Sequence, residues 1–270
     1  MLLLKVGGGA RIDFEAVARD LAAHPAREKV VVLGANACRE AVAGQTGAEL
    51  TRLNTASGRE SHLCDQAYMD LMWMSYAGLQ RGRFVAACRA AGLNAMGMSG
   101  LDGGVVVGRV NPGIRVRQGS RTFLVRDRSG RCESLNLGLL RHLLSWGVIP
   151  VITLPWSDGA GGSLVGDNDE LMVLLARHLH PEEVVFLHEA PGILRQKERE
   201  DSRMETVTYP ELNDLLQTWG KEGIGRKLRA ARDLLDLSVG RVLIADGRFP
   251  APILEGHSRG TLLEGPGVVA

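Results

Sequence analysis

The chain has 270 residues, of which 45% are hydrophobic and 23% charged, enough to form one large α/β domain or two fused lobes. The formal net charge is +1 and aromatic residues make up only 4%, so neither a nucleic-acid partner nor a membrane partner is expected. The four cysteines are scattered and show no CxxC spacing, so neither a disulfide framework nor a zinc site is expected. With no leader pattern before Leu2 and no long apolar run, the sequence predicts a cytoplasmic protein.

Apolar runs and helical patterns alternate from the first residues to the last. This alternation is typical of a largely parallel sheet with helices on both faces, and it predicts an α/β fold. Strands are predicted near residues 2–6, 29–33, 94–99, 104–110, 122–126, 148–153, 183–188 and 241–245. Helices are predicted near residues 13–23, 38–43, 65–91, 135–146, 167–179, 209–218 and 225–237.

The junction between the first strand and the first helix carries the clearest chemical signal. The strand runs into Lys5 and then into Gly7, Gly8 and Gly9. Glycines have no Cβ, so their amides can approach an anion closely, while the lysine adds a mobile positive charge. Because a helix N-terminus follows, this loop predicts a phosphate cradle, with a simple tight turn as the alternative. Its residue order is that of neither a P-loop nor a Rossmann fingerprint.

Glycine-containing turns also precede three later helices. The turn at residues 34–36 follows the second strand directly. Residues 166–170 place more acids at a helix start than an N-cap requires. Residues 223–227 place Arg226 and Lys227 at another helix start, where the helix dipole disfavours cations, so a ligand is one explanation of their presence.

Three segments depart from the regular alternation. Residues 105–133 contain two strand-like runs, which predicts an antiparallel hairpin at one edge of the sheet. The long helix at 65–91 is apolar almost all round, so both its faces are expected to be covered, either by the core or by a second copy of the chain. A cluster of Pro, Gly, Asp and Ser at 154–166 predicts the boundary between two halves.

Several short motifs occur together along the chain: LKVGGG at 4–9, GMSGLDG at 97–103, DND at 167–169, FL at 186–187 with PGIL at 191–194, GRK at 225–227, ADGR at 245–248 and GT at 260–261. In this order and spacing they resemble the amino-acid kinase family over essentially the whole chain. Within that family the chain is similar to the acetylglutamate kinase group. Its SGLDG run resembles the enzymes of lysine and ornithine (arginine) biosynthesis that phosphorylate aminoadipate or glutamate attached to a small acidic amino-group carrier protein.

The resemblance implies a three-layer αβα sandwich with a largely parallel central sheet, as in carbamate kinase-like folds. Residues 1–166 would form an amino-acid substrate lobe with the hairpin, and residues 167–270 an ATP-binding lobe. The implied reaction transfers the γ-phosphoryl group of ATP, with Mg²⁺ and no protein metal site, to a side-chain carboxylate and gives an acyl phosphate. Because that carboxylate is already ionised, no general base is required, and catalysis reduces to positioning and charge neutralisation.

The resemblance also implies a role for individual residues. Lys5 and Lys227 would flank the β- and γ-phosphates, with Asp169 between them as an orienting carboxylate. The implied phosphate-binding residues are Gly7, Gly8, Gly9 and Gly34, and amides of Gly7, Gly8 and Gly34 would hold the transferring group. The implied nucleotide-binding residues are Leu187, His188, Gly192, Leu194, Gly225 and Asp246. The implied acceptor-binding residues are Ala35, Asn36, His62, Val165, Asp167 and Asn168.

The acceptor side departs from the family pattern at three positions. Ala35 stands where a second glycine is usual, His62 where an arginine grips the substrate carboxylate, and Val165 where an asparagine is usual. An imidazole does not bind a carboxylate as a guanidinium fork does. With the phosphoryl-transfer residues intact, this predicts a working kinase with an altered acceptor. The alternatives are an ordinary N-acetylglutamate kinase and a nucleotide-binding relative without turnover.

A carrier-dependent kinase needs a surface complementary to an acidic partner. The hairpin region is rich in arginine, with Asp127 as the one acid before Glu133. Such an excess of like charge would steer an acidic domain, and the alternative is a solvated hairpin that protects a sheet edge. The predicted carrier-binding residues are Arg115, Arg117, Arg121, Arg126 and Arg128, with Arg109 and Arg131 beside them.

Overall fold

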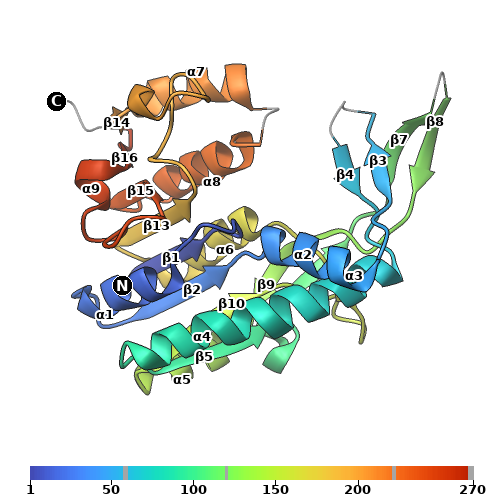
Figure 1. Ribbon diagram of the computed structural model, residues 1–270, viewed down its shortest axis with the longest axis horizontal. Helices are drawn as coiled ribbons and strands as arrows, with labels where there is room; N and C mark the ends of the chain where they lie inside the picture. The colour runs from blue at the N-terminus through green and yellow to red at the C-terminus, as the bar shows by residue number, and fades with distance from the viewer. Residues whose placement is uncertain (57–59, 119–120, 221–222, 267–270) are drawn as a thin grey trace.

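The computed structural model describes residues 1–56, 60–118, 121–220 and 223–266, and an eight-stranded sheet lies at its centre (Figure 1). Neighbouring strands run parallel except β15 and β16, which run antiparallel. The order is β14-β16-β15-β13-β1-β2-β10-β5, with β1 (Leu2–Val6), β2 (Lys29–Leu33), β5 (Ala95–Ser99), β10 (Ile149–Thr153), β13 (Glu183–His188), β14 (Thr206–Val207), β15 (Arg241–Asp246) and β16 (Thr261–Leu263).

Helices cover both faces of this sheet, as the alternating pattern predicts. One face packs against α1 and α4 through a core that includes Val17, Leu21 and Phe84. The other face packs against α2, α3, α5, α6, α7 and α8. The helices are α1 (Phe14–Ala23), α2 (Asn36–Thr46), α3 (Gln66–Met72), α4 (Arg81–Ala90), α5 (Leu137–Ser145), α6 (Asn168–Leu179), α7 (Tyr209–Trp219), α8 (Gly225–Asp236) and α9 (Gly256–Arg259). The predicted fold class, an α/β sandwich with a largely parallel sheet, is confirmed.

The two-residue repeat of β1 decides where its lysine lies. Leu2, Leu4 and Val6 belong to the core on the α1 side, whereas Leu3 belongs to the core on the α6 side. Successive side chains of a strand point to opposite faces, so Lys5 shares the face of Leu3. The lysine is therefore directed toward α6 and α8.

Two antiparallel pairs form within residues 105–133. The smaller sheets contain β3 (Arg52–Asn54), β4 (Glu60–His62), β6 (Val106–Val110), β7 (Ile114–Gln118), β8 (Arg121–Val125), β9 (Gly130–Leu135), β11 (Trp156–Ser157) and β12 (Ser163–Leu164). β6 pairs with β9, and β7 pairs with β8, whose connecting residues 119 and 120 lie outside the described residues.

The prediction that this hairpin extends an edge of the central sheet is wrong. β7 and β8 form a separate sheet that projects from the body beside the β3–β4 hairpin (Figure 1). The two hairpins join through a bridge between Thr55 and Val116 and a hydrogen bond of 2.7 Å from the Ala56 amide to the Arg115 carbonyl. Leu124 is 57% exposed, so the hairpin has little apolar surface buried against the body.

The predicted long helix is interrupted by a π-helical segment, η1 (Trp73–Gln80), between α3 and α4. Tyr68, Met72 and Tyr76 of this span are buried in the core of the chain. Met74 and Leu79 remain more than two-fifths exposed, so the chain itself covers one face only. Within the described residues, no helix combines the length and apolar character needed to cross a membrane.

Candidate active site

The candidate site lies where the carboxyl ends of the central strands meet. β1 ends just before Gly7, β2 just before Gly34, and β13 ends at His188. These strands are neighbours in the order β13-β1-β2, so the loops that leave them lie side by side. The crevice beyond such strand ends is where α/β sheets bind ligands.

Lys5, Asp169 and Lys227 form a charged cluster at this edge. Lys5 Nζ donates a hydrogen bond to Asp169 Oδ1, and both residues are buried. Burial alone would raise the pKa of Asp169, but the charges of Lys5 and Lys227 outweigh it and hold that pKa below its usual value. The charge of Lys5, together with burial, lowers the pKa of Lys227 to about 8. Two cations therefore share one carboxylate, which suits the cluster to an anionic ligand.

His188 borders the cluster from the end of β13. Burial and the nearby charge of Lys227 lower the pKa of His188 to about 4, so its imidazole is neutral near pH 7. Its Nε2 is buried and has no hydrogen-bond partner within the part of the chain that the structure describes. A neutral ring nitrogen is thus available to a ligand beside the two lysines.

The loops after β1 and β2 approach each other closely at Gly8. A Cβ on Gly8 would lie 2.6 Å from the amide nitrogen of Ala35, and it would also meet that of Asn36. The amide of Ala37 donates to the Gly8 carbonyl at 2.8 Å, which ties the first loop to the start of α2. In the described ranges the Gly8 amide itself has no hydrogen-bond partner. Gly8 therefore presents a free donor at a helix N-terminus.

The prediction that the amides of Gly7 and Gly34 hold the transferring group is wrong. The Gly7 amide donates to the Leu187 carbonyl at 2.9 Å, and the Gly34 amide donates to the Val6 carbonyl at 2.8 Å. Both amides continue the hydrogen bonding of the central sheet and are not free for a ligand. A Cβ on Gly9 would collide with the side chain of Glu189, so Gly9 lets that side chain lie close.

Two of the predicted nucleotide-binding residues have structural contacts instead. Leu187 is completely buried in the core on the α1 side. Asp246 is buried as well, and its carboxylate accepts hydrogen bonds from Arg248 Nε at 2.7 and 2.9 Å. The prediction that the Leu187 side chain contacts the nucleotide is wrong, because that side chain is completely buried. The Asp246 carboxylate is already hydrogen-bonded to Arg248.

Three further predicted nucleotide-binding residues, Gly192, Leu194 and Gly225, have defined backbone contacts. Gly192 has a φ of +118°, and a Cβ there would meet Thr261, so the turn requires glycine. Leu194 forms an isolated bridge with Arg203. Gly225 starts α8, where a Cβ would press on the backbone at the end of α7.

A pocket of about 780 Å³ opens beside the cluster, and we call it the acceptor pocket. Four of the six predicted acceptor-binding residues line it, namely Asn36, His62, Val165 and Asp167, and they come from widely separated segments. The other lining residues include Arg39, Thr55, Cys64, Tyr68, Met72, Tyr76, Asn111, Ile114, Ser129, Leu154 and Arg226. The structure thus brings the acceptor-side residues together around one cavity.

Ala35 and Asn168 are buried next to the acceptor pocket rather than in its lining. Ala35 is completely buried, with its amide nitrogen against Gly8. Asn168 Nδ2 donates to the Leu33 carbonyl at 3.4 Å and links α6 to the end of β2. The buried Ala35 side chain supports the loops of the site and does not reach the pocket. Acceptor binding by Asn168 stays a prediction, because its Oδ1 has no hydrogen-bond partner among the described residues.

Four residues that line the acceptor pocket were not predicted from the sequence to bind the acceptor: Arg39, Tyr68, Tyr76 and Arg226. Tyr76 Oη donates to Asn36 Oδ1 at 2.7 Å, and Arg226 Nη1 lies 3.2 Å from Asp167 Oδ2. A signal for Arg39 was present, because residues 36 and 39 lie one turn apart on the helix that follows the glycine turn.

Comparison with known proteins identifies the family. The sequence profile described as the amino acid kinase family matches residues 1–246. The chain belongs to the amino acid kinase family. It is 32% identical to a [LysW]-aminoadipate kinase of Thermus thermophilus, across 94% of this chain and 96% of that protein. It is 27% identical to an acetylglutamate kinase of Desulfitobacterium hafniense, across 94% of this chain and 86% of that protein.

Solved structures support the fold of this family member. The crystal structure of smu.665 from Streptococcus mutans superposes with a TM-score of 0.73 over 97% of this chain and 98% of that one. At 16% identity, this similarity establishes the shared fold alone.

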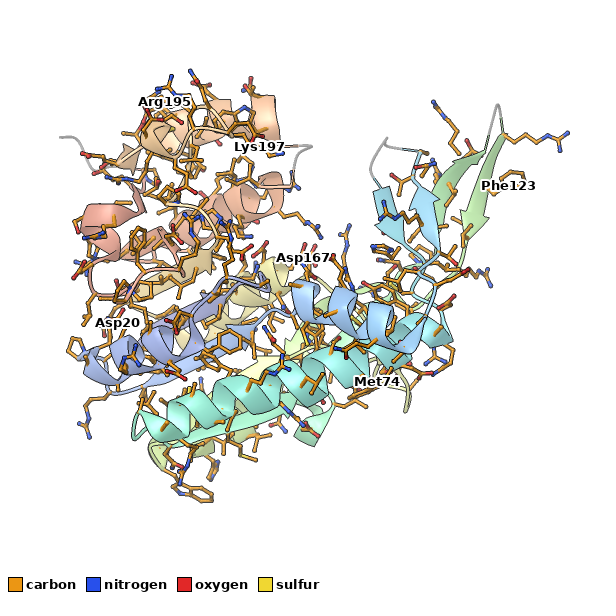
Figure 2. All side chains as sticks on the ribbon, viewed as in Figure 1. Asp20, Met74, Phe123, Asp167, Arg195 and Lys197 are labelled. Atoms are coloured by element: carbon orange, nitrogen blue, oxygen red, sulfur yellow. The ribbon has the colours of Figure 1, made fainter. Side chains whose placement is uncertain are left out.

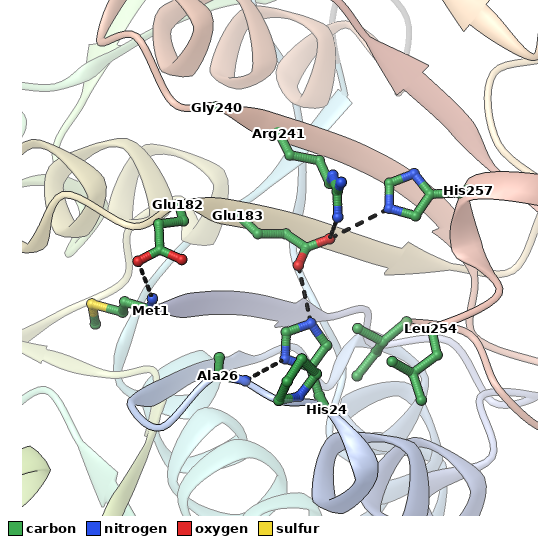
Figure 3. Close-up of a pocket in the computed structure, with 11 residues that line it drawn as sticks. Met1, His24, Ala26, Glu182, Glu183, Gly240, Arg241, Leu254 and His257 are labelled. Atoms are coloured by element: carbon green, nitrogen blue, oxygen red, sulfur yellow. Dashed lines mark hydrogen bonds and ion pairs between the residues drawn. The ribbon is translucent and has the colours of Figure 1, made fainter.

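A second cavity, of about 530 Å³, lies at the opposite edge of the sheet, where the strands begin (Figure 3). Its polar groups are paired with one another: Glu183 lies 3.0 Å from His24 Nε2 and 3.6 Å from Arg241 Nη1. The Ala26 amide donates to His24 Nδ1 at 3.2 Å, which leaves the other ring nitrogen to donate to Glu183. The polar groups of this cavity are thus paired within the protein, unlike the two cations that share Asp169 at the other edge of the sheet.

Proposed function

We propose that this chain is an ATP-dependent kinase that phosphorylates the side-chain carboxylate of an acidic amino acid attached to an amino-group carrier protein. The observation that carries the proposal is the buried cluster of Lys5, Asp169 and Lys227, two residues along α6 from Asp167, which lines the acceptor pocket together with Arg39 and Arg226. The similarity to a [LysW]-aminoadipate kinase over almost the whole chain supports the same reaction. In this proposal residues 1–166 bind the acceptor and residues 167–270 bind the nucleotide.

The proposed reaction is a direct phosphoryl transfer. A carboxylate oxygen of the acceptor forms a bond to the γ-phosphorus of ATP as the bond to the β,γ-bridging oxygen breaks, which gives an acyl phosphate and ADP. Lys5 and Lys227 neutralise charge on the transferring oxygens, and Asp169 keeps the two ammonium groups together. The free Gly8 amide and the N-terminus of α2 add donors on the same side.

Magnesium ion fits this proposal as a companion of the nucleotide. In the described parts of the chain, no group of three or more His, Cys, Asp or Glu residues could hold a metal ion. Magnesium in kinase sites is bound chiefly by substrate phosphates, water and one or two carboxylates, and it neutralises phosphate charge there. Asp169 and Asp167 are the carboxylates of this site that could assist.

The projecting hairpin offers the surface for an acidic carrier. Arg115, Arg117, Arg121, Arg126 and Arg128 are all exposed, and no ion pair joins them to another described residue. Figure 2 shows Phe123 on this hairpin, far out from the body of the molecule. Because Ile114 at the base of β7 lines the acceptor pocket, a carrier held by these arginines would have its modified residue close to that pocket.

A hydroxamate assay for acyl phosphate tests the proposal. The enzyme receives MgATP with free N-acetylglutamate, or with an acidic carrier protein bearing glutamate or aminoadipate at its C-terminus. Hydroxamate formed with the carrier and not with the free amino acid is expected. Product with N-acetylglutamate alone would instead support the second candidate, an acetylglutamate kinase, which the relative from Desulfitobacterium hafniense favours. No product with either acceptor would refute both.

Reversing charge on β7 is expected to weaken carrier recognition. Arg115 and Arg117 are two residues apart on β7 and therefore lie on the same face of the strand. The double variant Arg115→Glu/Arg117→Glu replaces two charges that attract an acidic carrier with two that repel it. We expect the KM for the carrier to rise about tenfold and its dependence on salt to weaken. The matched control is Arg19→Glu, an exposed change on α1. An unchanged KM in the hairpin variant would remove the hairpin from the proposed interface.

The activity is expected to fall as pH rises above about 8. Because the pKa of Lys227 is lowered to about 8, its positive charge is present well below that pH and is lost progressively as the pH rises through it. Since the charged form neutralises phosphate, kcat/KM for ATP should decrease on the alkaline side. Lys227→Arg, which stays protonated, should move this decrease to higher pH. A pH profile identical in both proteins would contradict the assigned role of Lys227.

The exposed apolar residues of η1, Met74 and Leu79, support a homodimer in which a second copy covers this face. Light scattering of the purified protein would measure that state directly.

A further inference from the structure

Arg39 reaches from α2 into the acceptor pocket with its charge almost completely removed from water. The residue is 8% exposed, and it lines the pocket together with Asn36 and Tyr68. Arg39 Nη1 donates to Tyr68 Oη at 2.7 Å, and the guanidinium lies 5.4 Å from the centre of that ring. The Tyr68 hydroxyl therefore fixes the orientation of the guanidinium plane.

The other edge of the guanidinium is not satisfied by the protein. Arg39 Nε is buried and has no hydrogen-bond partner among the residues described. Arg39 Nη2 has Glu40 Oε1 at 3.6 Å, beyond hydrogen-bond distance, and the Glu40 side chain is 69% exposed. A buried cation with an unsatisfied donor costs free energy unless an anion pairs with it. Nε and Nη2 together form the fork that matches the two oxygens of a carboxylate.

The second arginine of the pocket differs in this respect. Arg226 Nη1 lies 3.2 Å from Asp167 Oδ2, and the Arg226 side chain is 64% exposed. It is thus both paired with an acid and open to solvent. Of the two guanidinium groups that line the described pocket, Arg39 is the one without a hydrogen-bonded carboxylate, since its ion pair with Glu40 is 3.6 Å long.

We propose that the Nε–Nη2 edge of Arg39 is a binding site for the non-reacting carboxylate of the acceptor. An acidic amino acid joined to its carrier through the amino group keeps two carboxylates. One is phosphorylated and must lie near Lys5 and Lys227, so the other needs a separate cation in the same pocket. This inference rests on the proposed function, because it names which group of that acceptor Arg39 recognises.

Binding of two small probes tests this assignment without turnover. Isothermal titration calorimetry compares N-acetylglutamate with its α-carboxamide analogue, which keeps the side-chain carboxylate. The wild-type protein is expected to prefer the dicarboxylate about 10- to 100-fold, the range of a charge-assisted, bidentate hydrogen bond. Arg39→Met should bind both probes equally weakly. Arg39→Lys, which keeps a point charge without the fork, should retain part of the preference.

Thermal unfolding separates this role from a structural one. If Arg39 awaits a ligand, Arg39→Met removes an unsatisfied buried charge, so its Tm without probe should equal or exceed that of the wild type. A Tm well below the wild-type value would identify a structural arginine and overturn the proposal. Arg83→Met on α4 is the exposed control and should keep the wild-type preference.

Two further outcomes would overturn the carboxylate subsite. The first is that the wild-type protein binds N-acetylglutamate and its α-carboxamide analogue equally well, or binds neither. The second is an undiminished preference in Arg39→Met. The proposed function fails by a different result, which is the absence of acyl phosphate with every acceptor. If the protein prefers the dicarboxylate probe but forms no hydroxamate, the carboxylate subsite is retained and the kinase activity is rejected.

Discussion

Replacing Lys227 with methionine is expected to lower kcat by about 10³-fold while changing the dissociation constant of ATP by less than about tenfold. Negative charge spreads over the transferring oxygens in the transition state, and a buried ammonium group stabilises that charge more than it stabilises bound ATP. Lys227 also raises the electrostatic potential around Asp169 and His188, whose pKa values it lowers. Single-turnover kinetics measures the chemical step, and equilibrium binding of a non-hydrolysable ATP analogue measures affinity.

Arg232→Met is the matched control for this change. Arg232 lies on the same helix, α8, and its guanidinium pairs with Asp233 away from the cluster. This control should keep wild-type turnover. If Lys227→Met lost ATP affinity and turnover by equal factors, Lys227 would be a ground-state binding residue, and its proposed role in the transition state would be refuted.

Gly8→Ala is expected to reduce activity at least about 10²-fold and to destabilise the fold by about 1–3 kcal/mol. The added Cβ would lie 2.6 Å from the Ala35 nitrogen, and backbone at this point cannot move aside as a flexible side chain can. The hydrogen bond from Ala37 to the Gly8 carbonyl holds the two loops together, so any displacement would move the start of α2. Thermal unfolding and the hydroxamate assay together measure both effects.

Gly44→Ala tests whether the effect belongs to the close approach. Gly44 lies on α2, and an added Cβ there would meet no atom within 4 Å. Because alanine is the better helix former, this variant should be more stable by up to about 1 kcal/mol and fully active. Normal activity of Gly8→Ala would show that the approach of the two loops is not needed for phosphoryl transfer.

The order of strands and helices follows from patterns that lie within short segments. The alternation of apolar runs with helical patterns is a local property, and strands such as β1, β2 and β13 agree with their predicted ranges. The interruption of the long helix by η1 was not predicted. Its composition gives no local signal for the π-helical spacing, and a contact from another element reaches its backbone: Cys38 Sγ of α2 donates a hydrogen bond to the Ser75 carbonyl.

The position of the hairpin shows why edges are harder to predict than strands. β7 and β8 pair as an antiparallel hairpin, yet β7 contacts Thr55 of the neighbouring hairpin instead of an edge of the central sheet. Strand pattern indicates which residues can pair. It does not indicate which of several open edges will receive them.

The sequence by itself determined the α/β class and the family, and it predicted Lys5, Asp169 and Lys227 as site residues, because each of these inferences depends on motifs contained in a few consecutive residues. Only the tertiary structure decided which polar groups are free. Gly7, Gly34 and Asp246 have binding-site chemistry in the sequence, but their hydrogen bonds are made within the fold. Arg39 has no motif, yet its Nε is left without a partner in the described structure. Availability for a ligand depends on contacts between segments far apart along the chain, which no local pattern specifies.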